Sequence, residues 1–118
     1  MAAMEIIEND TKLFRLDSCA DTHVCNDHAR FTTFKPIRHD IIRAGDTFTT
    51  ISGTGTVHIT VRGPKGPKTV KLLDVAYCPG FHLNLVSYIR LKASGVRWND
   101  EIGWLKFKGK KYAQTIEA

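Results

Sequence analysis

The chain has 118 residues, fits one domain, and carries a net charge of +5 on an ordinary globular composition of 42% hydrophobic and 25% charged residues. No apolar run approaches the roughly 20 residues that span a bilayer, and the acidic start M-A-A-M-E-I-I-E lacks the basic region of a secretory signal. Three cysteines are an odd number, so we expect reduced thiols in a reducing, intracellular compartment.

Short β-strands separated by turn residues dominate the pattern. The first strand is expected over residues 11–16, directly before a polar segment. The run T-F-T-T-I-S-G-T-G-T-V-H-I-T-V-R predicts two strands around a turn that contains Gly53 and Gly55. The turn G-P-K-G-P follows, and T-V-K-L-L-D-V-A-Y predicts the next strand, which Pro79 and Gly80 break.

The second half of the chain predicts one helix and then further strands. Ser87 can cap the helix S-Y-I-R-L-K-A-S, and Gly95 can end it. Strands follow, separated by turns at residues 99–103 and at Gly109. We therefore expect an all-β domain over residues 11–118, a small closed or nearly closed barrel with one short helix. Residues 1–10 would form a tail or an interface segment, and dimerisation would add to the modest burial of so short a chain.

The segment L-D-S-C-A-D-T-H-V-C-N-D-H, residues 16–28, concentrates the groups that could carry chemistry. Cys19, His23, Cys25 and His28 are all zinc-ligand types, but the spacing C-x3-H-x-C-x2-H on one short segment would crowd a tetrahedral ion. Cys19 or Cys25 beside a histidine could form a nucleophile and its base. No recognisable cysteine-hydrolase signature surrounds them.

Asp17 offers a third interpretation of the same segment. It follows an apolar strand and precedes the small residues Ser18, Cys19 and Ala20, whose tight turn could fix a carboxylate with backbone N–H groups. Aspartic-protease chemistry needs two such carboxylates that share one proton, and a two-fold dimer would supply the second. In a simpler alternative, Asp17 and Ser18 only cap a turn.

The remaining polar residues favour structural or surface roles. The strand alternation favours a structural role for His23. Asp21 and Asp27 are expected at turn or surface positions, and Asp21 lies near enough to Asp17 in sequence to contact a partner or a substrate. A nucleic-acid partner is possible on charge alone, although a solvated hairpin face is the simpler explanation. The basic residues of this late cluster are Lys65, Lys68, Lys71, Lys106, Lys108, Lys110 and Lys111.

The order of elements resembles the retroviral and retrotransposon aspartic proteases, most closely those of the Ty1/copia type. L-D-S-C-A matches the family loop D-[ST]-G-A except at Cys19. I-S-G-T-G-T-V-H-I-T-V resembles the glycine-rich flap hairpin, and N-L-V-S-Y-I-R-L-K-A-S-G resembles the N-L-[LV]-S segment with its short helix. The resemblance covers about residues 13–98, and the ordered set of three motifs is more specific than any one of them.

The resemblance implies an aspartic endopeptidase, active as a homodimer without metal or cofactor, in the cytoplasm or in virus-like particles. Asp17 of each chain would be catalytic, in the loop formed with Ser18, Cys19 and Ala20. The element's own polyprotein would be the substrate, bound as an extended strand by the flap. The flap residues would be Ile51, Ser52, Gly53, Thr54, Gly55 and Thr56. Packing behind the catalytic loop would come from Leu85, Val86 and Ser87.

Cys19 departs from the family pattern, which has glycine at this position. Glycine lets the backbone approach the paired carboxylates and adopt angles that a β-carbon resists. A cysteine adds bulk and a thiol beside the two carboxylates. The alternative function is therefore a catalytically impaired dimerisation or peptide-binding module with the same fold.

Overall fold

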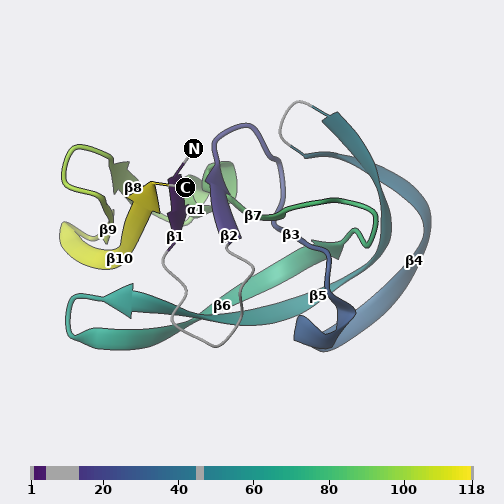
Figure 1. Ribbon diagram of the computed structural model, residues 1–118, viewed down its shortest axis with the longest axis horizontal. Coiled ribbons are helices and arrows are strands. Elements are labelled where there is room, and N and C mark those ends of the chain that lie inside the picture. The colour runs from purple at the N-terminus through teal and green to yellow at the C-terminus, as the bar shows by residue number, and fades with distance from the viewer. Residues whose placement is uncertain (1, 5–13, 45–46, 118) are drawn as a thin grey trace.

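The computed structural model of the protein describes residues 2–4, 14–44 and 47–117, and strands dominate them (Figure 1). The helices are α1, Tyr88–Ala93, and a 3-10 helix, His28–Arg30. The strands are β1 (Ala2–Met4), β2 (Phe14–Asp17), β3 (Val24–Cys25), β4 (Phe31–Ala44), β5 (Thr47–Gly63), β6 (Gly66–Tyr77), β7 (Asn84–Ser87), β8 (Val96–Asn99), β9 (Trp104–Phe107) and β10 (Lys110–Glu117).

The strands belong to one curled sheet that forms a half-barrel (Figure 1). In the described residues their order is β4-β5-β6-β3-β7-β2-β1-β10-β9-β8. Most neighbours are antiparallel, but β2 runs parallel to β7 and β3 runs parallel to β6. The expected all-β fold with one short helix is therefore confirmed. None of the described helices is long and apolar enough to cross a membrane.

Turn chemistry explains where the regular elements end. Gly63 pairs with Gly66 across a two-residue turn, and Gly66 has a φ of 110°, a conformation that glycine adopts without a steric penalty. The Ser87 side chain accepts a hydrogen bond from the Arg90 N–H and so caps α1. Gly95 follows the helix with a φ of 99°. These turns and both ends of the helix were expected from the sequence.

The prediction of a hairpin tip at Gly53 and Gly55 is wrong, because both glycines lie inside the continuous strand β5. They face Pro36 and Phe34 of β4 on one side, and β6 on the other. A β-carbon at Gly55 would overlap the carbonyl oxygen of Thr33, and one at Gly53 would overlap the Phe34 ring. The glycines therefore permit close approach of two strands, which is a known use of glycine within a sheet.

The first part of β5 forms a two-stranded ribbon with β4. Residues 47–51 pair with residues 40–44 of β4, whereas the ladder between β5 and β6 begins only at Gly53. Residues 45 and 46, which join the two strands, lie outside the described residues. This ribbon extends beside the β2–β3 loop in Figure 1.

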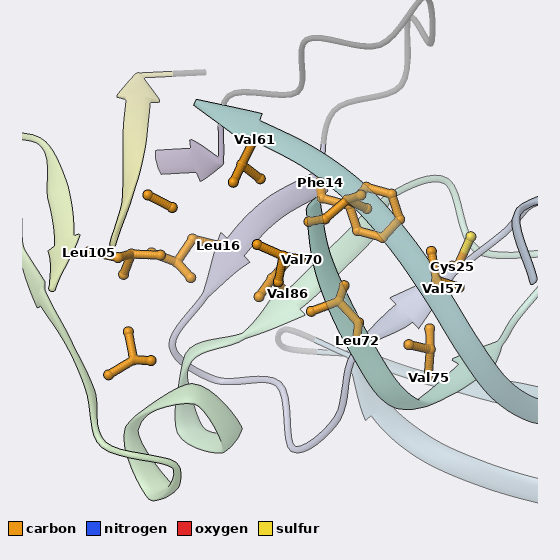
Figure 2. Close-up of a cluster of buried hydrophobic side chains, with 13 residues drawn as sticks. Phe14, Leu16, Cys25, Val57, Val61, Val70, Leu72, Val75, Val86 and Leu105 are labelled. Atoms are coloured by element: carbon orange, nitrogen blue, oxygen red, sulfur yellow. The ribbon is translucent and has the colours of Figure 1, made fainter. Parts of the chain in front are cut away.

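Two apolar clusters hold the fold together. The larger one joins β2, β5, β6 and β7 to the β8–β10 end, and Figure 2 shows Leu16 beside Leu105 and Val70 beside Val86. The smaller one includes Ala20 of the β2–β3 loop, and Ile42 and Ile51 of the ribbon pack into it. Burial of each large aliphatic side chain contributes roughly 1.5–3 kcal/mol. The second cluster thus anchors the ribbon to the loop that follows Asp17.

The amino-terminal strand pairs within the chain. Ala3 of β1 lies opposite Arg15 of β2 and Ile116 of β10. The residues expected to form a tail or an interface segment therefore include a strand between two others of the same sheet. Residues 5–13, which include the start of the first expected strand, lie outside the described part of the chain.

Candidate active site

Asp17 ends β2 with its carboxylate held in a fixed position. The residue is only 7% exposed. Its Oδ1 accepts hydrogen bonds from the Cys19 N–H at 2.7 Å and the Ala20 N–H at 3.2 Å. A turn cap makes the same two bonds, so the turn-cap alternative stays open on this geometry alone. The bonds do immobilise one carboxylate oxygen, as a catalytic carboxylate requires.

Strand β7 supports the Asp17 loop from inside the fold. Leu85, Val86 and Ser87 are buried, and Ser87 lies opposite Asp17 in the parallel ladder. The Ser87 hydroxyl donates to the Ala20 carbonyl at 2.7 Å and accepts from the Arg90 N–H at 3.2 Å. One hydroxyl therefore connects the loop to the first turn of α1.

Cys19 fits the loop without backbone strain. The non-glycine residues with positive φ in the described chain are Asp74 and Lys108, so Cys19 does not need the angles that only glycine adopts freely. Ser18 and Cys19 are both exposed, and their side chains lie about 4.0 Å apart. The loop therefore tolerates a cysteine where the resembled family has glycine.

His23 is a buried structural acceptor, as its strand position indicated. Its ring is 4% exposed, and Nδ1 accepts a hydrogen bond from the Ser87 N–H at 2.9 Å. Burial, and secondarily the charge of Arg90, lowers the pKa of His23 from 6.5 to about 3. The ring is therefore neutral and carries its proton on Nε2, so neither nitrogen is free to act as a base for Cys19.

The pKa of His23 predicts a loss of stability in acid. The folded pKa of about 3 is below the unfolded value of 6.5, so the unfolded chain binds the extra proton as the pH falls through this window. The neutral ring contributes its full stabilisation above pH 6.5. This contribution decreases as the pH falls toward 3, and at pH 5 the free energy of unfolding is lower by about 2 kcal/mol. His23→Asn keeps an acceptor but does not titrate. Urea unfolding at pH 7 and 5 should show a smaller acid loss for this variant than for the exposed control His58→Asn; equal losses would contradict the assignment.

The four zinc-ligand types of this segment do not converge. Cys19 is exposed, Cys25 is fully buried, and His28 lies in the 3-10 helix against the rings of Phe34 and Tyr77. Within the ranges that the structure describes, no three His, Cys, Asp or Glu side chains are grouped to hold a metal. Burial and the neighbouring Cys25 raise the pKa of Cys78 to about 11, as for an inert buried thiol.

Arg90 is a second support that the sequence pattern did not indicate. Its guanidinium donates to the Thr22 hydroxyl at 3.2 Å and to the Asp74 carbonyl at 3.0 Å. The Thr22 hydroxyl also donates to the Asp74 carbonyl, at 3.2 Å. These bonds join the β2–β3 loop, β6 and α1, so the loop is held on two sides.

A groove of about 550 Å³ separates the Asp17 loop from the ribbon. Asp21 and Thr22 line its loop side, and Ile41, Ile42 and Phe48 line its ribbon side. Ile41 is 65% exposed and Phe48 is 74% exposed. Apolar side chains are thus presented to solvent beside the segment that carries Asp17, at a place the sequence analysis did not single out.

Comparison with known proteins decides the family. Residues 14–96, more than half of the chain, match the family described as "Pol polyprotein, beta-barrel domain". The chain belongs to this family. It is also 35% identical over 72 residues to a putative transposon Ty5-1 protein of Saccharomyces cerevisiae. That match covers 60% of this chain and 44% of the yeast protein, so the chain spans less than half of the relative's length. The protein is thus a retrotransposon Pol-type domain.

The family match of this Pol β-barrel domain ends before the lysine-rich β9–β10 hairpin. One of the lysines of the late cluster is already engaged, because Lys68 donates to the Tyr112 carbonyl at 2.8 Å and lies 3.5 Å from the centre of its ring. The Lys111 ammonium lies 5.0 Å from the centre of the Trp104 ring. Nucleic-acid binding by this end stays a prediction, and affinity that falls steeply with added salt is its test.

Proposed function

We propose that this Pol β-barrel domain is an aspartic endopeptidase that cleaves a retrotransposon polyprotein as a homodimer. The observation that carries the proposal is the Asp17 loop, in which two backbone N–H groups fix one carboxylate oxygen. Ser87 and Arg90 support the loop from behind and from the side. A turn cap on the protein surface would not need to be held by three other elements, here β6, β7 and α1.

The dimer would bring one Asp17 from each chain to its two-fold axis. One carboxylate, ionised, would take a proton from a water that attacks the peptide carbonyl, and the other, protonated, would supply a proton to the leaving amine. Because one carboxyl would have to be ionised and the other protonated, cleavage should follow a bell-shaped pH profile. Ser18, exposed beside Asp17, would brace the two loops across the axis.

The substrate would lie in the groove between the Asp17 loop and the ribbon. Both backbone edges of β5 at residues 53–55 face neighbouring strands, so we assign peptide binding to the ribbon of residues 40–44 and 47–51 instead. Ile41 and Phe48 would contact apolar side chains of the peptide, and burial of those surfaces would favour closure over it. The ribbon would thus bind the substrate peptide, which is the role first expected of the flap around Gly53 and Gly55.

The second candidate function is a non-catalytic dimerisation or peptide-binding module. Cys19 favours it, because an exposed thiol and β-carbon would stand beside the paired carboxylates where the resembled enzymes have none. The groove and the sheet would serve equally well to hold a peptide that is not cleaved. Both candidates share the cytoplasm or a virus-like particle as their setting and differ only in chemistry.

Cleavage by the native chain and by Cys19→Gly separates the two functions. We expect both proteins to cleave a peptide substrate, within about tenfold of each other, since Cys19 causes no backbone strain. The rate of peptide cleavage per chain is the measurement. Activity that appears only in Cys19→Gly would establish the non-catalytic module for the native chain, and activity in neither would reject the enzyme.

A further inference from the structure

A second hollow of about 360 Å³ lies beside α1, away from the Asp17 groove. Strand β6, helix α1 and the β8–β10 end enclose it. Its wall is mainly apolar, with Leu72 of β6, Leu91 of α1 and Phe107 of β9 among the lining side chains. A cavity of this size, mostly apolar with a few polar groups, has the usual character of a small-molecule site.

The cavity exists because α1 is too short to fill the space beside the sheet. The helix has six residues, and none of them is buried. It ends at Ala93, and Gly95, which follows the cap residue Ser94, has no side chain to contact the Phe107 ring. Leu73, at the rim, is 51% exposed, so apolar surface continues outward from the cavity.

Positive charge marks the mouth of the cavity. Lys71 and Arg90 are among the lining residues, and none of the lining residues within the described part of the chain is an aspartate or a glutamate. The Arg90 guanidinium lies 3.8 Å from the carboxylate of Asp74, whose side chain is 87% exposed. A pair so open to water compensates little of the charge. The Lys71 side chain is exposed, and among the residues that the structure describes it forms no ion pair.

We propose that this cavity binds a small amphipathic carboxylate, with its hydrocarbon part inside and its carboxylate at Lys71 and Arg90. The apolar wall would contact the hydrocarbon part of a medium-length fatty acid. Each CH₂ group that moves from water into the cavity contributes roughly 0.8 kcal/mol to the free energy of binding. The two cations would hold the head group by charge-assisted hydrogen bonds. The inference concerns binding and does not depend on catalysis at Asp17.

The ligand would contact the supports of the Asp17 loop. His23 lines the cavity and accepts from the Ser87 N–H, and Ser87 donates to Ala20 in the loop. Arg90 lines the cavity and donates to Thr22. Occupancy would therefore stabilise the folded chain and, through these contacts, reduce the mobility of the loop.

Titration of the full chain with decanoate, followed by calorimetry, tests the proposal. We expect saturable binding of one decanoate per chain, and at least fivefold weaker binding of decanol, which lacks the charge. Lys71→Glu should weaken decanoate binding by about fivefold or more. Lys110→Glu makes the same charge change on β10, outside the lining residues, and should change it less than twofold.

Each alternative outcome would overturn a stated part of the proposal. Absence of saturable binding to the native chain rejects the site. Equal binding of decanol and decanoate, or equal weakening by the two lysine variants, rejects recognition of the carboxylate at this mouth. Leu91→Trp should fill the cavity and remove binding while the circular dichroism spectrum is retained; undiminished binding by a folded Leu91→Trp protein would place the ligand elsewhere.

Discussion

Asp17→Asn is expected to abolish peptide cleavage and to leave the fold in place. The asparagine Oδ1 can accept the same hydrogen bonds from Cys19 and Ala20, so the loop keeps its shape. The amide cannot share a proton with a second carboxyl group, and the loss of one member of a catalytic unit lowers the rate by roughly 10⁴-fold or more. The measurement is kcat/KM on a peptide substrate, beside urea unfolding.

Asp100→Asn provides the matched control for this experiment. It removes the same charge from an exposed turn between β8 and β9, and we expect cleavage to change less than about twofold. Cleavage by Asp17→Asn at the parent rate would mean that Asp17 only caps its turn. A folded Asp17→Asn protein without activity is the result that the aspartic-protease mechanism requires.

Gly55→Ala is expected to destabilise the whole domain. The new β-carbon would overlap the Thr33 carbonyl oxygen, which belongs to the backbone of β4 and cannot rotate away. Strands β4 and β5 would have to separate, or lose their register at this point, at a cost of about 3 kcal/mol. That is a large fraction of the stability of a small domain. The urea midpoint of unfolding measures the loss.

Thr54→Ala is the control for Gly55→Ala, because it changes the neighbouring residue of the same strand toward a smaller side chain. We expect a shift of less than about 1 kcal/mol for this partly exposed position. Comparison of the two variants shows whether Gly55 permits the close approach of β4 and β5 or belongs to a substrate-binding flap. If Gly55→Ala unfolds at the parent's urea concentration and loses only cleavage, the close approach of β4 and β5 is wrong and a flap role is restored.

Acid would act in opposite directions on the proposed pair of Asp17 carboxyls and on the stability that His23 contributes. A carboxyl pair at the Asp17 site would work best below neutral pH, whereas the buried His23 loses its stabilising contribution as the pH falls from 6.5 toward 3. For the proposed endopeptidase we therefore expect cleavage to be highest in mild acid. The effect on the carboxyl pair would be measured as the rate of cleavage, and the effect on His23 as the free energy of unfolding.

Several strands, the turn at residues 63–67 and the helix were predictable because their signals are local, but no strand was expected over residues 31–44, which form β4. Alternation of apolar residues, the pair Gly63 and Gly66, and the caps Ser87 and Gly95 act within a few residues along the chain. The role of Gly53 and Gly55 was not predictable in the same way. A glycine at a turn and a glycine under a neighbouring strand look alike in sequence, and the neighbour here is some twenty residues away.

From the residues alone the candidate site was predictable only in Asp17, and the place of Leu85, Val86 and Ser87 behind its loop was expected only from the family resemblance. Asp17 stands out because small residues follow it directly, but its supports come from distant positions. His23 meets Ser87 across 64 residues, and Arg90 meets Thr22 across 68. The apolar ribbon beside the groove was also missed, because exposed Ile41 and Phe48 follow no pattern that differs from an ordinary strand. Such contacts are decided by the fold and leave no local signature.

The most direct test of the proposed function is the separation of the two Asp17 carboxylates in a crystal structure of the protein. We predict a two-fold dimer in which the carboxyl oxygens of the two chains lie about 3 Å apart, close enough to share one proton. A monomer whose Asp17 faces solvent alone, or a dimer that places the two carboxylates far apart, would contradict it.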